Sequence, residues 1–174
     1  MQAPDVSLHL HHFQPKYWDD VRTILTSYEK QYFDEYDIEH YRKKLHEDVL
    51  HDDRRNHLFS LLLMENETIV GIIIVERQED SQFYWEIVCL AIKKGTQGKG
   101  YGRLLVQDAV LRVKKMGGKH VYAKTPHEKY NKDTESFYRH VGFSRVAVLP
   151  NYYPSTTPSH RPYLDCALYY KELT

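Results

Sequence analysis

The sequence has few cysteines and no long apolar run. Its 2 cysteines, Cys89 and Cys166, lack the CxxC spacing typical of zinc or redox sites, and we expect two reduced interior thiols. The longest apolar runs, such as Ile69–Val75, are far shorter than the ~20 residues of a membrane helix. The N-terminus lacks the basic and apolar segments of a signal peptide. These absences favour a soluble cytoplasmic protein with no membrane partner.

The chain also lacks a net charge. Its 24 basic residues balance 24 acidic ones, which argues against nucleic acid as a partner but leaves room for a small phosphorylated ligand. Among 11 histidines, His9 and His11 share one face of a predicted strand. No Cys or carboxylate stands at metal-ligand spacing from them, so we predict no metal site. The length suits one domain, and we expect residues 1–174 to form it.

Hydrophobic periodicity predicts a mixed α/β (α+β) fold. The strands between Leu58 and Ile92 are joined by turns too short for a parallel crossover, so the first half should be antiparallel. A strand, glycine loop, helix and strand then add a right-handed crossover. The expected strands are Val6–Phe13, Leu58–Met64, Ile69–Val75, Phe83–Ile92, His120–Ala123, Arg145–Leu149 and Leu164–Leu173, and the expected helices are one opened by Pro15, Ile38–Leu50, Leu104–Met116 and Asp133–His140.

The strongest local signal is the glycine-rich segment Gly95–Gly102, which precedes a helix that we expect to be buried on most sides. Glycines allow close backbone approach, and free N–H groups at a helix N-terminus bind anions, so a pyrophosphate fits, with Lys99 and Arg103 adding charge. A Walker loop would need Lys and Ser or Thr where Tyr101 and Gly102 stand. A dinucleotide fingerprint would need glycine at Arg103. A glycine-rich turn without ligand is the remaining alternative.

This segment resembles the acetyl-CoA-binding motif of the GNAT family of N-acetyltransferases. The motif is Gln-x-x-Gly-x-Gly, here Gln97–Gly102, after a strand that ends at Ile92. The resemblance implies that the loop amides bind the CoA pyrophosphate and that the strand pairs with the pantetheine arm. The residues thereby assigned to the cofactor are Leu90, Ala91, Ile92, Gln97, Gly98, Lys99, Gly100, Tyr101, Gly102 and Arg103.

A second motif extends the resemblance to about half the chain. Asn131 precedes Tyr138 by seven residues, and Gly142 and Phe143 follow, in an order similar to the family's last helix. The resemblance implies that Asn131 contacts the cofactor while capping the helix. It also implies that Tyr138 lies near the CoA sulfur and protonates the thiolate, with a core position as the alternative. The implied fold is a mostly antiparallel mixed sheet, splayed at the cofactor site and flanked by helices.

Glu86 is the candidate general base. It lies between Tyr84 and Val88 on a mostly apolar strand face, so its carboxylate must pair, reach solvent or have a raised pKa. The segment Glu86–Ile92 resembles histone-type GNAT members, in which a glutamate here deprotonates the amine, commonly through water. A structural ion pair is the alternative. We expect direct acyl transfer, with the amide of Leu90 or a neighbour polarising the carbonyl and no acyl-enzyme.

The segment Pro150–Pro154 is the best clue to the acceptor. Tyr152 and Tyr153 resemble the Asn-Tyr-Tyr-Pro loop of ribosomal-protein N-terminal acetyltransferases, whose aromatics border the substrate N-terminus. Those enzymes carry a glutamate where this chain has Lys129. The resemblance implies an acetyl-CoA-dependent N-acetyltransferase acting on a peptide N-terminus or lysine, and we expect a monomer or homodimer. A small-molecule amine acetyltransferase and a non-catalytic acyl-CoA sensor are the alternatives.

Overall fold

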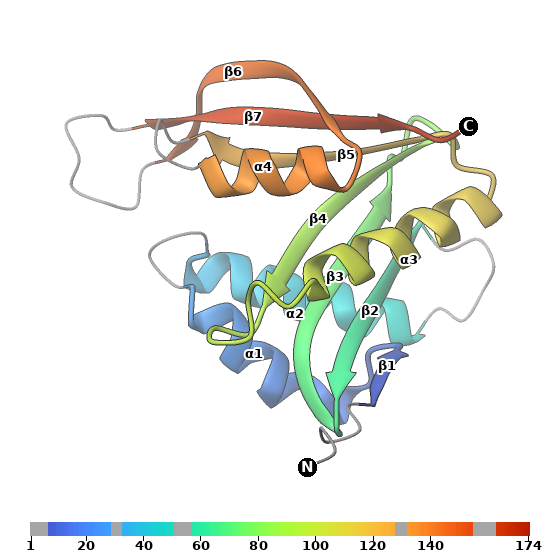
Figure 1. The fold of residues 1–174 in the computed structure, drawn as a ribbon, viewed down its shortest axis with the longest axis vertical. Coiled ribbons are helices and arrows are strands. Elements are labelled where there is room, and N and C mark those ends of the chain that lie inside the picture. Colours follow the sequence, from blue (N-terminus) through green and yellow to red (C-terminus); the bar gives the residue numbers. More distant parts are fainter. Residues whose placement is uncertain (1–6, 29–32, 51–56, 128–131, 155–162) are drawn as a thin grey trace, which may run out of the picture.

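A seven-stranded mixed sheet organises the chain in the computed structural model, which describes residues 7–28, 33–50, 57–127, 132–154 and 163–174 (Figure 1). Alternating and β-branched apolar residues form its strands, as the sequence predicts. The strands are β1 (Leu8–His11), β2 (Leu58–Glu65), β3 (Thr68–Arg77), β4 (Tyr84–Ile92), β5 (His120–His127), β6 (Ser144–Pro154) and β7 (Tyr163–Glu172). The helices are η1 (Pro15–Tyr17), α1 (Trp18–Thr26), α2 (Glu35–Leu50), α3 (Tyr101–Lys115) and α4 (Lys132–His140).

Two layers of helices cover the two faces of the sheet. The strand order is β1-β2-β3-β4-β5-β7-β6, and every neighbouring pair is antiparallel except β4 and β5. Helices α1 and α2 pack on one face, and α3 and α4 on the other, so that two separate apolar clusters form (Figure 1). The predicted antiparallel first half, followed by a parallel crossover, is confirmed.

The parallel pair β4 and β5 opens into a gap. Its register runs from Tyr84 opposite His120 to Ile87 opposite Ala123, and both strands continue beyond it. Figure 1 shows β4 and β5 diverging from a shared end near the C-terminus. The predicted splay is therefore present, and it begins at Val88 of β4 and Lys124 of β5.

A β-bulge lies at the same point of β4. Ile74 of β3 pairs with Cys89 and Val75 with Ile87, so Val88 has no partner on β3. One extra residue reverses the alternation of side chains. Ile87 accordingly belongs to the cluster under α3 and α4, whereas Cys89 belongs to the cluster under α1 and α2. The bulge thus ends the part of β4 that carries Glu86.

Two sequence predictions need correction. Helix α3 begins at Tyr101 rather than Leu104, and it is amphipathic rather than buried on most sides, since Leu104 and Leu111 are 40% and 56% exposed. The segment Pro150–Pro154, expected to be a loop, lies within β6, where Tyr153 pairs with Leu164. Aromatic residues favour strands, and an irregularity between Leu149 and Tyr153 absorbs the change in register.

Candidate active site

The loop between β4 and α3 presents unpaired backbone amides. Gly95, Gly98 and Gly100 have φ angles of 85°, 81° and 83°, a left-handed conformation that favours glycine. The first backbone bond of α3 runs from the Leu104 N–H to the Gly100 carbonyl at 3.1 Å, and no side chain caps this end. The amides before Leu104 therefore lack intrahelical acceptors and can bind an anion such as a pyrophosphate.

The side chains of this loop mostly point to the protein rather than to a ligand. Gln97 donates to the Tyr28 hydroxyl at 2.7 Å, and Tyr101 donates to Glu65. Lys99 lies 3.4 Å from the same carboxylate. The sequence analysis assigned Gln97 and Tyr101 to the cofactor. Because their side chains bond to other residues of the protein, their backbone amides are the groups that could serve this role. Arg103 is exposed and forms no ion pair within the described residues.

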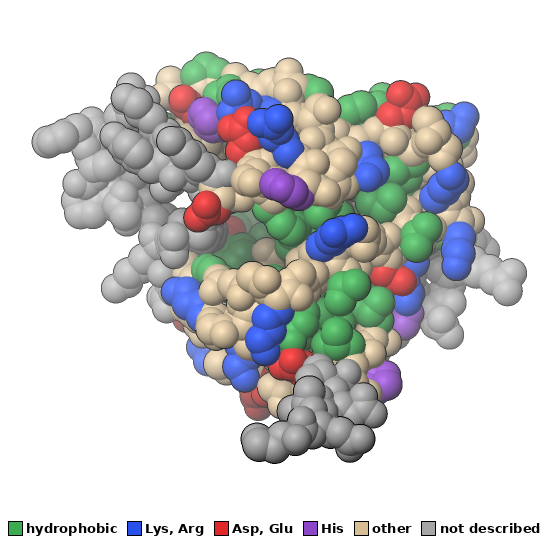
Figure 2. Space-filling view, viewed as in Figure 1, with side chains coloured by type: hydrophobic (Ala, Val, Ile, Leu, Met, Phe, Trp, Pro, Cys, Tyr) green, Lys and Arg blue, Asp and Glu red, His purple; other side chains and the backbone are tan. Residues whose placement is uncertain are grey.

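Helices α3 and α4 approach each other closely at Gly102. A Cβ atom at Gly102 would lie 3.1 Å and 3.3 Å from two ring atoms of Phe137. Glycine at this position therefore lets α4 pass beside the first turn of α3. Figure 2 shows a hollow with apolar side chains between α4 and the β4–α3 loop. In Figure 1, β4 passes between these two elements.

The edge of β4 that faces the gap carries the backbone of Leu90. Lys93 donates its N–H to the Val70 carbonyl of β3 at 2.8 Å. In an antiparallel pair, residues bonded to the partner alternate with residues whose backbone groups point away. Ile92 and Leu90, one and three residues before Lys93, therefore direct their N–H and carbonyl groups away from β3.

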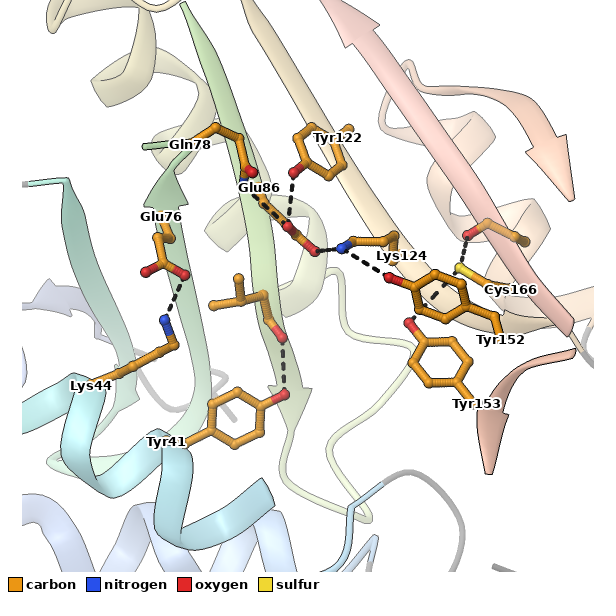
Figure 3. A network of polar contacts seen from close by, with 12 residues as sticks. Tyr41, Lys44, Glu76, Gln78, Glu86, Tyr122, Lys124, Tyr152, Tyr153 and Cys166 are labelled. Carbon is orange, nitrogen blue, oxygen red and sulfur yellow. Dashed lines mark hydrogen bonds and ion pairs between the residues drawn. The ribbon is translucent and has the colours of Figure 1, made fainter. Parts of the chain in front are cut away.

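Two tyrosines cap carbonyls on either side of Leu90. The Tyr28 hydroxyl donates to the Ile92 carbonyl at 2.6 Å. The Tyr41 hydroxyl of α2, shown in Figure 3, donates to the Val88 carbonyl at 3.0 Å. Both caps come from the layer opposite α3 and α4. The Leu90 amide, which lies between the capped positions, is the donor that a bound carbonyl group can use.

Tyr138 of α4 places its ring in the core beside the gap. The ring stacks on Tyr169 of β7 at 4.6 Å, and the residue is 5% exposed. Burial raises the pKa of Tyr138, and the neighbouring Tyr169 and Cys89 raise it further, so the hydroxyl is protonated at neutral pH. No hydrogen bond ties this hydroxyl to another group of the described residues. The proton is available to a ligand.

Glu86 lies on the face of the sheet opposite Tyr138, at the end of the paired part of β4 and β5. Its carboxylate accepts hydrogen bonds from Tyr122 at 2.8 Å and Gln78 at 3.3 Å, and lies 3.2 Å from Lys124 Nζ (Figure 3). The Glu86 side chain is 13% exposed. Of the three alternatives for a carboxylate on this face, pairing with a cation is the one that the structure adopts.

The two tyrosines of β6 face this carboxylate from across the gap. The Tyr152 hydroxyl accepts a hydrogen bond from Lys124 at 3.4 Å, and its ring packs edge-on against Tyr153 at 4.9 Å (Figure 3). Tyr153 turns toward Cys166, whose thiol lies 3.8 Å from its hydroxyl. Asn151, with φ of 54°, donates its N–H to Asp165 at 3.0 Å and fixes the turn of the strand.

The sequence did not identify Tyr41, Tyr122 and Lys124, which complete this network. Tyr122 is the register partner of Glu86, and Lys124 lies two residues further along β5, so both side chains share a face of the sheet with Glu86. Only the register of β4 and β5 places these residues beside Glu86, and this register cannot be read from local sequence spacing. Asn131, predicted to contact the cofactor, lies outside the described residues.

Cys89 is an unsuitable nucleophile for an acyl-enzyme. It is 3% exposed, and burial, together with the charge of Asp37, raises the pKa of its thiol. Cys166 is also buried and free. The described part of the chain has no group of three or more metal-ligating side chains. No helix among the described residues is long and apolar enough to cross a bilayer.

Comparisons with known proteins converge on one family. The model of the acetyltransferase (GNAT) family matches residues 18–143, which include both motifs. The chain is similar to a [ribosomal protein bS18]-alanine N-acetyltransferase of Haemophilus influenzae, with 26% identity over 106 residues, 61% of this chain and 68% of the relative.

Solved structures share the fold. A GNAT-family protein from Desulfovibrio desulfuricans has a TM-score of 0.80 at 20% identity, over 95% of this chain and 99% of that one. A GNAT acetyltransferase from Elizabethkingia anophelis with acetyl-CoA bound has a TM-score of 0.69 at 18% identity, over 98% of this chain and 100% of that one. The predicted fold class is confirmed.

Proposed function

Because the chain belongs to the GNAT family of acetyltransferases and is an acetyl-CoA-dependent N-acetyltransferase, we propose that its acceptor is the N-terminal amine of a peptide or protein. The predictions of family, enzyme class and cosubstrate are confirmed by the family match. The identity of the acceptor and the roles of individual residues are the subject of the proposal.

The residues around the gap fit acetyl-CoA. Bound there, it supplies a thioester whose carbonyl is attacked by an amine and whose thiolate departs. The unpaired amides between Gln97 and Arg103 would hold its pyrophosphate, and Lys99 and Arg103 would add positive charge. Leu90, Ala91 and Ile92 form the open edge of β4, where an extended arm can pair. The Leu90 amide would polarise the carbonyl.

One observation carries the proposal for the acceptor: Glu86 and the two tyrosines of β6 form a polar and aromatic wall on the α2 side of the gap (Figure 3). A peptide N-terminus would enter along Tyr152 and Tyr153 and place its amine near Glu86. The carboxylate would then take a proton from the amine, directly or through water. The relative from Haemophilus influenzae is named for acetylation of an alanine of ribosomal protein bS18, in agreement with this choice.

Tyr138 would complete the transfer from the opposite layer. Its hydroxyl stays protonated at neutral pH, because burial raises its pKa, and it is not bonded to another described group. It would donate this proton to the departing thiolate while the amine nitrogen forms the amide bond. Glu86 and Tyr138 thereby act from opposite faces of the sheet, one on the incoming amine and one on the leaving sulfur.

An α-amine suits this site better than a lysine side chain. The pKa of an α-amine is about 8, so roughly a tenth of it is neutral at pH 7, whereas that of lysine is about 10.4. Glu86 is already engaged with three partners. Because part of an α-amine is already neutral at pH 7, the reaction depends less on proton removal by this carboxylate.

A thiol-release assay with acetyl-CoA tests the proposal. The panel contains peptides beginning with a free alanine, the same peptides with a blocked N-terminus and an internal lysine, and spermidine. We expect thiol release with the free N-termini and at least tenfold less with the blocked peptides. Preferential reaction of spermidine would favour a small-molecule enzyme, and acetyl-CoA binding without release on any amine would favour a sensor.

A further inference from the structure

We propose that Lys124 sets the charge preference of the acceptor site, so that the enzyme favours N-termini whose second residue is acidic and discriminates against cationic acceptors. This inference rests on the proposed function, because it concerns the acceptor of that reaction. It arises from the pairing of charges on the face of the sheet that carries Glu86.

The carboxylates of Glu76 and Glu86, on this part of the sheet, each form an ion pair with a lysine. Glu76 of β3 and Glu86 of β4 are register partners, so their side chains share a face. Lys44 of α2 lies 2.5 Å from Glu76, and Lys124 of β5 lies 3.2 Å from Glu86 (Figure 3). An incoming cation therefore meets two neutralised carboxylates rather than an acidic pocket.

Lys124 is fixed at the mouth of the gap by several contacts. Its Nζ donates to the Tyr152 hydroxyl and lies 5.9 Å and 5.8 Å from the ring centroids of Tyr122 and Tyr152. Burial alone would lower the pKa of Lys124, but the charge of Glu86 and the hydrogen bonds outweigh it and raise this pKa. The side chain, 28% exposed, thus remains charged and within reach of an acceptor.

The remaining donor capacity of Lys124 explains the direction of the preference. An ammonium group has three donors, and Glu86 and Tyr152 engage two of them. The third can bind a carboxylate close to the reacting amine. A cationic side chain at the same place would be repelled, and repulsive contacts are an effective source of specificity.

Two amidated peptides beginning Ala-Glu and Ala-Arg, otherwise identical, test the inference. We would measure kcat/KM by thiol release and the Kd of each peptide for the CoA-bound protein by calorimetry. The wild type should prefer the acidic peptide about tenfold. Lys124→Met should abolish this preference, with a gain on the basic peptide, and Lys124→Arg should retain it. Lys44→Met, which frees the charge of Glu76 but leaves Lys124 in place, is the matched comparison and should change the ratio clearly less than Lys124→Met does.

The outcomes separate the inference from the proposed function. An unchanged ratio in Lys124→Met, or an equal change in Lys44→Met, overturns the role of Lys124 and leaves the enzyme intact. A gain on the basic peptide supports the inference, since damage to the fold would not raise activity. If neither peptide is acetylated while the Kd ratio still depends on Lys124, the acceptor class is wrong and the charge preference stands.

Discussion

The two sides of the gap between β4 and β5 are built in different ways. The proposed cofactor side offers backbone amides of one continuous segment, with glycines at Gly95, Gly98 and Gly100 that permit its conformation. The proposed acceptor side offers side chains from β4, β5, β6 and α2, such as Glu86, Lys124 and Tyr41, which are far apart in the sequence. A motif can specify the first kind of site, whereas the second depends on strand register and can vary while the first is kept.

The largest effect is expected for Tyr138→Phe, which removes the hydroxyl proposed to protonate the thiolate and leaves the groups that bind cofactor and acceptor unchanged. We expect kcat to fall by about 300-fold, within the range of general-acid catalysis, with the Kd for acetyl-CoA unchanged. Stopped assays and calorimetry measure the two quantities. Tyr169→Phe, in the stacked partner, should lose less than threefold. Equal losses in both variants would assign Tyr138 to packing instead of catalysis.

Glu86→Gln should affect the acceptor side alone. The amide cannot take a proton, so we expect kcat/KM for the peptide to fall about 100-fold, at the lower limit for a general base. Binding of acetyl-CoA, measured by calorimetry, should not change. Glu76→Gln, at the register partner, serves as the control. A matching loss of acetyl-CoA affinity in Glu86→Gln would contradict the separation of the two sides.

Substitutions of Gly102 should affect the cofactor side alone. Gly102→Val would push the Phe137 ring away from α3, and overpacking of this kind costs about 1–3 kcal/mol. We expect the Kd for acetyl-CoA to rise about tenfold, with kcat at saturation retained within threefold. Gly102→Ala, which adds one carbon, should show a smaller change in the same direction. A fall of kcat without a change of Kd would argue against this assignment.

The contact between Tyr101 and Glu65 predicts a small, pH-dependent effect on stability. The Tyr101 hydrogen bond, together with the charge of Lys99, holds the pKa of Glu65 below its usual range. A lowered folded-state pKa stabilises the fold above the unfolded-state pKa of about 4.3, and this contribution is lost as pH falls through the folded-state value. Tyr101→Phe should therefore lower Tm at pH 7 and lose this effect in acid. A pH-independent difference in thermal melts would contradict this.

The smallest effect on rate is expected for Cys89→Ala. The thiol is buried and its pKa is raised, so we expect that it does not carry the acetyl group. Turnover should stay within twofold of the wild type, with a stability loss of about 1 kcal/mol. Pre-steady-state measurements should show no burst of thiol in either protein. A burst that disappears in the variant would require an acyl-enzyme.

The sequence predicted the strands and the glycine-rich loop because their signals are local. β-Branched runs placed β3 to within two residues at either end, and Gln97–Gly102 identified the cosubstrate. It could not predict that the Gln97 side chain binds Tyr28, 69 residues away, because this contact depends on where α1 ends. The sequence could not identify Lys124 for the same reason, because its position beside Glu86 follows from the register of β4 and β5. The predictions of one domain over residues 1–174, of a monomer or homodimer and of a cytoplasmic location stay predictions.

The bulge at Val88 has a consequence for how the protein tolerates change. Before it, β4 turns Glu86 toward the acceptor layer, and after it, Leu90 packs toward the opposite layer. Deletion of Val88 would restore a regular ladder, with Ile87 and Cys89 opposite successive residues of β3, and every other side chain of the strand would keep its layer. A one-residue insertion in the regular part of β4 would instead exchange the layers of all later residues. The strand should therefore tolerate the loss of one residue at the bulge, whereas a single insertion should unfold the protein.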